Sequence, residues 1–172
     1  MYYSEIAWHS FKLLNFTHST TVNALEQKQM STLLFETLDP IKIPLIKRFY
    51  KEHYPGTKPK SDELTIVAYD DSVLVGVVRF RHVGQLRLLT GMAISSSKRG
   101  QGIGQQLLAY CVEHILQNDD YCFAYSHLKD FYQNGGFKKI SPEQLPADLK
   151  TLYQRYTQHG KDLIPMHFRY DR

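Results

Sequence analysis

The chain has 172 residues, a net charge of +4 at neutral pH and a hydrophobic fraction of 42%. These values suit one globular domain of ordinary size and exclude a disordered chain. No apolar run approaches the roughly 18 residues of a membrane span, and the first residues lack the basic and apolar regions of a secretory signal. The two cysteines, Cys111 and Cys122, are too few for a disulfide framework and lack metal-ligand spacing. We therefore expect a reduced, cytoplasmic protein without a bound metal.

The pattern of apolar residues predicts an α/β fold. Residues 1–29 have no clear periodicity and are assigned to an N-terminal extension of a single domain, whose core is residues 30–172. The core pattern predicts strands over residues 32–38, 64–69, 73–82, 86–94, 121–125, 137–140 and 163–170. It predicts helices over residues 44–54, 103–117 and 128–134, and a helical segment within 145–159. This alternation favours a mixed, mostly antiparallel central sheet with flanking helices.

Two residues inside these elements have a predictable role. Gly91 interrupts the strand over 86–94, which is otherwise apolar enough to be buried on both faces. A glycine inside a strand marks a bulge or a close backbone approach, so we expect one of these at Gly91. Cys111 lies in the apolar stripe of the helix over 103–117 and is therefore expected in the core, not as a nucleophile.

Basic residues gather in a stretch that lacks acids. From Ser72 to Val112 there is no Asp or Glu, and the basic residues are Arg79, Arg81, Arg87, Lys98 and Arg99. They can form either a solvated basic face or a site for an anionic ligand. Arg79 and Arg81 share a strand face, so they either contact an acceptor carboxylate or are simply exposed. The chain lacks a basic helix, which argues against nucleic-acid binding.

A glycine-rich loop is predicted between the strand over 86–94 and the following helix. Its sequence is Lys98-Arg99-Gly100-Gln101-Gly102-Ile103-Gly104. Exposed main-chain N–H groups and the positive end of a helix dipole bind phosphate well. A nucleoside-triphosphate loop would need Lys-Ser or Lys-Thr after its last glycine, where this chain has Gln105-Gln106. The dinucleotide fingerprint fails because it needs a glycine at position 105.

The spacing of Arg99, Gly102 and Gly104 resembles the R-x-x-G-x-G pyrophosphate-binding motif of the GNAT superfamily of acetyl-CoA-dependent N-acetyltransferases. The segment Met92-Ala93-Ile94-Ser95 resembles the end of that family's pantetheine-binding strand. The segment Phe131-Tyr132-Gln133-Asn134-Gly135-Gly136-Phe137 is similar to its F-Y-x-x-x-G-F element. The order of elements from about residue 32 to residue 170 also matches that acyl-CoA N-acyltransferase fold.

The resemblance implies acetyl-CoA as co-substrate and a role for each matching residue. Main-chain N–H groups of the loop would hold the pyrophosphate, and Met92 and Ile94 would pair with the pantetheine arm. The Met92 N–H would stabilise the developing oxyanion, and Tyr132 would protonate the departing thiolate. The implied cofactor-binding residues are Met92, Ala93, Ile94, Arg99, Gly100, Gln101, Gly102, Ile103, Gly104 and Gln105.

The implied reaction is direct attack by a primary amine of a small molecule or peptide in a ternary complex. The glutamate that many members carry before the pantetheine site is absent from Leu86–Gly91. This favours an acceptor amine of low pKa, with His82 as another candidate base. The alternative is a non-catalytic acyl-CoA-binding or sensing module. No membrane or nucleic-acid partner is expected, and the sequence leaves a homodimer and the acceptor's identity open.

Overall fold

The computed structural model describes residues 33–170, so the extension assigned to residues 1–29 lies outside the described part. In this part seven strands form one sheet in the order β1-β2-β3-β4-β5-β7-β6. The strands are β1 (Leu33–Thr37), β2 (Leu64–Asp70), β3 (Val73–Val83), β4 (Leu86–Ile94), β5 (Asp120–Tyr125), β6 (Phe137–Lys139) and β7 (Leu163–Phe168). All neighbouring pairs are antiparallel except β4 and β5.

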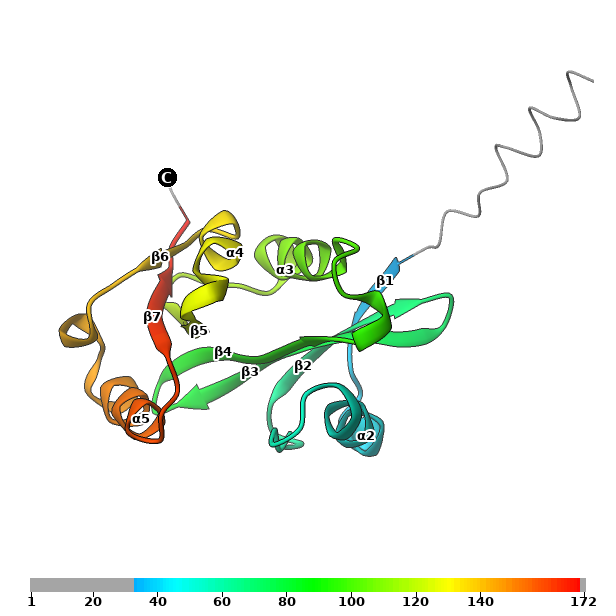
Figure 1. The fold of residues 1–172 in the computed structure, drawn as a ribbon, viewed down its shortest axis with the longest axis horizontal. Helices are drawn as coiled ribbons and strands as arrows, with labels where there is room; N and C mark the ends of the chain where they lie inside the picture. The colour runs from blue at the N-terminus through cyan, green and yellow to red at the C-terminus, as the bar shows by residue number, and fades with distance from the viewer. Residues whose placement is uncertain (1–32, 171–172) are drawn as a thin grey trace, which may run out of the picture. The chain divides into compact units, whose positions relative to one another are not determined.

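Within residues 33–170, four α-helices flank the sheet. They are α2 (Ile43–His53), α3 (Ile103–His114), α4 (Lys129–Asn134) and α5 (Ala147–Gln158). Helices α2 and α5 cover one face and α3 and α4 the other (Figure 1). The predicted mixed, mostly antiparallel sheet with flanking helices is thus confirmed. The ends differ by a few residues: α3 stops at His114, not 117, because Ile115 leaves the helical conformation at φ −124°.

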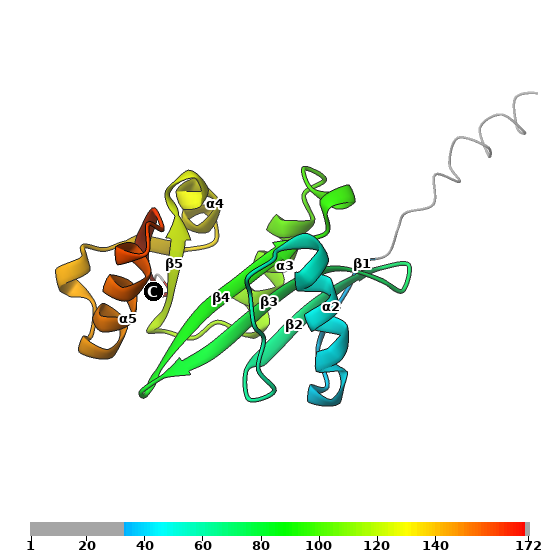
Figure 2. The same ribbon diagram turned by 60° about the horizontal axis from the view of Figure 1, so that its bottom comes forward.

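The sheet opens between β4 and β5 (Figure 2). The two strands pair only over Arg87–Leu89 and Asp120–Cys122, although β4 continues to Ile94. The strand was expected to be buried on both faces, and for its second half this expectation is wrong. Leu88, Leu89 and Ala93 are buried, whereas Thr90, Gly91 and Met92 are partly exposed, because within residues 33–170 no strand pairs with that edge of β4.

A buried ion pair fixes the closed end of this junction. Arg87 and Asp120 are register partners, and the Asp120 carboxylate accepts from Arg87 Nε at 2.7 Å and Nη2 at 2.5 Å. The same carboxylate accepts the Gln117 N–H at 2.9 Å, and Arg87 Nη2 donates to the Ile115 carbonyl at 2.6 Å. The Asp120 side chain is only 2% exposed. Both carboxylate oxygens of Asp120 accept hydrogen bonds, which offsets the cost of burying the charge.

The predicted irregularity at Gly91 is confirmed as a bulge. Val77 pairs with Ala93 and Arg79 with Thr90, so Gly91 and Met92 together oppose the single residue between Val77 and Arg79. Gly91 has φ +61°, and a Cβ there would lie 2.7 Å from Arg79 Nη2. Only glycine fits this conformation and this space. The bulge therefore combines both features expected at this position.

We expect Asp120→Asn to lower the free energy of unfolding by about 3 kcal/mol, because the Arg87 charge would stay buried without its counter-charge. The matched control is Asp119→Asn, since Asp119 is 59% exposed and its carboxylate contacts His167 and the exposed Arg169. The control should cost less than about 1 kcal/mol. Urea denaturation measures both values, and equal losses would contradict a special role for the buried pair.

Candidate active site

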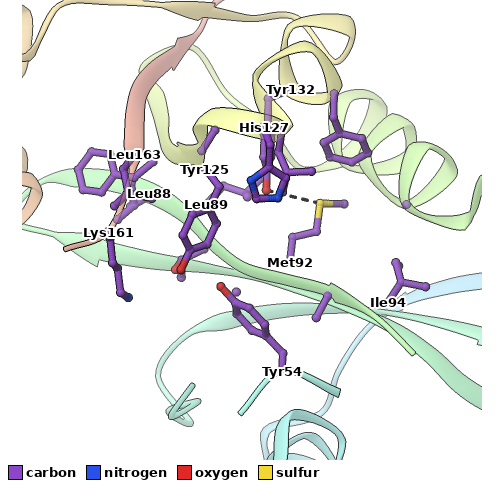
Figure 3. A pocket seen from close by; sticks show the side chains of 18 of the residues that line it. Tyr54, Leu88, Leu89, Met92, Ile94, Tyr125, His127, Tyr132, Lys161 and Leu163 are labelled. Carbon is purple, nitrogen blue, oxygen red and sulfur yellow. Dashed lines mark hydrogen bonds between the residues drawn. The ribbon is translucent and has the colours of Figure 1, made fainter. Parts of the chain in front are cut away.

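A pocket of about 520 Å³ occupies the opening between β4 and β5 (Figure 3). Gly104, Phe131 and Tyr132 line it from α3 and α4; these residues define its loop side. Its tyrosine side, from the opposite face of the sheet, is lined by Tyr54, Tyr125 and Tyr156. The pocket therefore passes through the sheet, along the unpaired edge of β4.

The structure brings most of the residues implied by the sequence together. Those that line the pocket are Met92, Ala93, Ile94, Arg99, Gly104 and Tyr132. Gly100, Gln101 and Gly102 form the exposed or half-exposed loop that leads into α3, and Gln105 lines an adjacent groove. The Ile103 side chain is buried in the core, so only its main chain faces the loop.

The loop before α3 fits an anionic ligand. Gly100 and Gly102 have φ of +76° and +79°, and a Cβ at either would meet nothing within 4 Å. Gly102 is the N-cap of α3, no side chain caps the helix, and its first turn carries no acid. The N–H groups at the helix start are therefore uncovered, and the helix dipole favours negative charge there.

The basic side chains around this loop are bonded to other groups of the protein, so they add little free positive charge for an anionic ligand. Lys98 Nζ lies 2.6 Å from Asp70 Oδ2. Arg99 donates to two main-chain carbonyls, from Nε to Ile94 at 3.1 Å and from Nη2 to His53 at 2.7 Å. These bonds hold the loop against β2, β4 and the end of α2. Arg99 thus lines the pocket but acts first as a structural clamp.

The other arginines of the acid-free stretch are also engaged. Arg79 is buried and forms an ion pair with Glu63, and Arg87 pairs with Asp120. Arg81 is half-buried and donates to the Tyr156 hydroxyl at 3.4 Å. The interpretation of Arg79 as an acceptor contact is therefore wrong. The acids that neutralise this stretch come from other parts of the sequence.

Tyr132 is buried on the loop side with its hydroxyl toward β4 (Figure 3). That hydroxyl lies 3.9 Å from the Met92 sulfur, and the rings of Phe131 and Phe137 hold the phenol edge-on at 5.0 and 5.8 Å. Burial, with smaller effects of Cys122, Tyr54 and Tyr50, raises the Tyr132 pKa well above its usual range. The phenol is therefore protonated at neutral pH and beyond.

The tyrosine side contains residues that sequence reasoning missed. The hydroxyls of Tyr54 and Tyr125 point toward each other (Figure 3), and burial, with a smaller effect of the neighbouring Tyr125, raises the Tyr54 pKa to about 12. His127 lines the pocket and stacks near Tyr125, with ring centroids 5.8 Å apart. His82, the base considered from sequence, is exposed and does not line the pocket. No Asp or Glu lines it either.

Comparison with known proteins decides the family. A model of the acetyltransferase (GNAT) domain matches residues 40–156. The chain belongs to the GNAT acetyltransferase family. No curated protein matches it. Within residues 33–170, this GNAT chain has no helix of the length and apolarity needed to cross a membrane, and no cluster of three or more His, Cys, Asp or Glu that could hold a metal.

Solved structures share the fold at low sequence identity. N-acetylglutamate synthase from Neisseria gonorrhoeae, complexed with coenzyme A and N-acetyl-glutamate, has 16% identity and a TM-score of 0.62, covering 84% of this chain and 36% of that one. The IAA acetyltransferase from Bacillus cereus has 17% identity and a TM-score of 0.60, covering 81% and 100%. The ribosomal-protein-S18-alanine N-acetyltransferase from Escherichia coli has 12% identity and a TM-score of 0.58, covering 80% and 93%. This chain thus spans about a third of the synthase.

The cysteines of this GNAT chain do not offer a covalent route. Cys111 and Cys122 are buried, and neither lines the pocket. Burial raises the pKa of Cys111 to about 12 and that of Cys122 well above its usual range. A thiol must be deprotonated and accessible to act as a nucleophile. The expectation that Cys111 belongs to the core is confirmed.

We therefore expect neither thiol of the folded protein to react at pH 8 with a disulfide reagent that releases a coloured thiolate. Both thiols should react once the chain is denatured. Absorbance with and without guanidinium measures the two states. Rapid reaction of one thiol in the folded protein would contradict this account of the core.

Proposed function

We propose that the protein is an N-acetyltransferase that moves an acetyl group from acetyl-CoA to a primary amine of a small molecule or peptide. The observation that carries this proposal is the pocket through the sheet. It joins a glycine loop and Tyr132 on one face to an aromatic recess on the other. Two substrates can then meet at the edge of β4, which suits direct transfer in a ternary complex.

The loop side suits the co-substrate. We assign the pyrophosphate to the main-chain N–H groups of residues 101–105, where the glycines allow close approach. The pantetheine arm is assigned to the open edge of β4. The Ser95 N–H donates to Val75 on β3 at 2.8 Å, so by strand alternation the main-chain groups of Ile94 point away from β3. Arg99 occupies the Ile94 carbonyl, which leaves the Ile94 N–H for the arm.

The chemistry requires charge stabilisation and one proton donor. The neutral amine nitrogen attacks the thioester carbon, the carbon–sulfur bond breaks and the sulfur leaves as thiolate. The nitrogen, which is cationic once it is bonded to carbon, releases one proton as the amide forms. We assign the Met92 N–H to the oxygen that gathers negative charge, and the Tyr132 hydroxyl to the departing sulfur. A thiol has a pKa near 8.5, well below that of this phenol, so the proton transfer is uphill and its benefit modest.

The acceptor must lose its own proton before attack. At pH 7.4 a lysine-like amine with pKa near 10.4 is only about one part in a thousand neutral, at a cost near 4 kcal/mol, whereas an α-amino group with pKa near 8 costs under about 1 kcal/mol. Because no carboxylate lines the pocket, we favour the amine of lower pKa. His127 is the imidazole that lines the pocket and is the candidate acceptor of this proton.

The test is incubation with acetyl-CoA and a panel of amines of graded pKa, with free thiol as the readout. Buried cysteines keep the protein's own background low. We expect release of coenzyme A with acceptors of pKa near 8 and a matching acetylated product by mass spectrometry. Binding of coenzyme A without release for any amine would instead support the sensing module.

Gly104→Ala should separate stability from cofactor binding. A Cβ there would make ordinary contacts, 3.5 Å to Phe131 and 3.7 Å to Ile94, and alanine is better than glycine in a helix. We expect the free protein to gain about 0.5–1 kcal/mol by urea denaturation. We also expect calorimetry to show coenzyme A binding weakened by about tenfold, because the methyl group occupies the surface that the phosphates approach.

The control for this variant is Gly56→Ala, at a loop glycine with open space around it and no place in the pocket. Its φ of +86° disfavours alanine, so it should lose stability and keep its affinity for coenzyme A. A Gly104→Ala protein that is stabilised and binds coenzyme A normally would remove the pyrophosphate assignment.

Tyr132→Phe keeps the ring and its packing and removes only the hydroxyl. We expect turnover to fall by roughly 10–100-fold, the low end for a general acid, while acetyl-CoA affinity changes little. Because its pKa is raised, Tyr132 should cause no loss of wild-type turnover between pH 7 and about 10. Unchanged turnover in the variant, with chemistry shown to limit the rate, would exclude Tyr132 as the acid.

A further inference from the structure

A buried chain of polar groups runs behind the bulge in β4, on the face that α2 covers. The side chains of Glu63 and Arg79 form an ion pair and are only 7% and 5% exposed. Arg79 Nε donates to the Tyr50 hydroxyl at 3.1 Å, and that hydroxyl donates to the Gly91 carbonyl at 2.5 Å. Tyr50 itself is 1% exposed. This network of polar groups therefore ends on one main-chain carbonyl of β4.

Stability alone does not account for such an arrangement. Taking an ion pair out of water carries a large desolvation cost, and well-packed apolar side chains at the same place are often as stable or more so. The arrangement also requires glycine at position 91, since a Cβ there would lie 2.9 Å from both the Tyr50 hydroxyl and Arg79 Nε. The polar network can therefore approach β4 this closely only because residue 91 has no side chain.

The orientation of that peptide follows from its planarity. In a trans peptide the carbonyl of one residue and the N–H of the next point in opposite directions. Because Tyr50 holds the Gly91 carbonyl toward α2, the Met92 N–H must point away from α2. Gly91 and Met92 both line the pocket. The Met92 N–H, assigned above to the thioester oxygen, therefore belongs to the same peptide group whose carbonyl accepts the Tyr50 hydrogen bond.

We propose that Tyr50, held by Arg79 and Glu63, is a positioning residue that orients the Met92 N–H and strengthens it as a hydrogen-bond donor. This inference rests on the proposed function. A hydrogen bond into the carbonyl withdraws electron density from the amide, so the N–H becomes a stronger donor, and the Arg79 charge adds to the effect. A donor fixed before the substrate arrives needs no reorganisation when charge develops.

Tyr50 suits this role because it remains a donor across the working pH range. Burial, opposed in part by Arg79, raises its pKa to about 12. The alternative is that the network only anchors α2 against β4. The two roles differ in what happens at Met92 and in whether kcat or cofactor affinity changes.

The first readout is the amide signal of Met92 in the ligand-free protein. The chain has four methionines, so ¹⁵N-methionine labelling gives few signals, and Met92→Leu assigns the one of interest. We expect Tyr50→Phe to move the Met92 ¹⁵N resonance upfield, because its peptide carbonyl loses a hydrogen bond. Glu63→Gln, which leaves Tyr50 in place, should move it less in the same direction and serves if Tyr50→Phe does not fold.

The second readout is kinetic. We expect Tyr50→Phe to lower kcat about tenfold, with KM for acetyl-CoA and Kd for coenzyme A unchanged, since a weakened donor acts mainly in the transition state. The control is Ile46→Val, which trims a fully buried side chain in the same cluster of α2 and should leave the Met92 signal and kcat unchanged.

The outcomes separate this inference from the proposed function. If neither Tyr50→Phe nor Glu63→Gln moves the Met92 signal or kcat beyond the Ile46→Val control, the network is only structural and the inference is overturned. If the Met92 signal moves but the wild type acetylates no amine, the orientation of the peptide stands and the proposed function fails.

Discussion

The short parallel contact between β4 and β5 is the constraint on which the site depends. Three residues of each strand pair, and the buried Arg87–Asp120 ion pair closes this end of the junction. Beyond it, β5 stays paired with β7 but no longer with β4, so within residues 33–170 the edge of β4 has no partner strand. An unpaired edge inside a sheet presents main-chain donors and acceptors that an extended ligand can use. The pocket is therefore a consequence of where the pairing stops.

The two faces of the sheet then contribute different chemistry to that edge. On one face, the start of α3 and the phenol of α4 offer uncovered N–H groups and a protonated hydroxyl. On the other face, α2 supplies Tyr50, which holds the bulge by its Gly91 carbonyl, and Tyr54, the residue after α2, borders the pocket. Arg99 ties the loop to the end of α2 through the His53 carbonyl. The helix that borders the tyrosine side thus also stabilises the loop side.

Much of this could be predicted from the sequence because it is local. Strand and helix periodicity gave the order of elements, the glycine loop marked the start of α3, and Gly91 marked the bulge. The interpretation of the basic residues, as a solvated face or an anion site, was wrong. The stretch from Ser72 to Val112 lacks acids in sequence, yet Glu63, Asp70 and Asp120 neutralise three of its cations in space. Tyr54 and His127 were missed for the same reason, since only the fold brings the ends of α2 and β5 together.

The central claim is that the open edge of β4 receives the thioester. A crystal structure with bound coenzyme A, or with a non-hydrolysable acetyl analogue, tests it most directly. The account predicts the pyrophosphate on the main chain of residues 101–105, the pantetheine arm along β4, and the analogue's carbonyl oxygen at hydrogen-bond distance from the Met92 N–H. A ligand seated instead in the groove beside Phe168 and Arg169, with the β4 edge untouched, would contradict it.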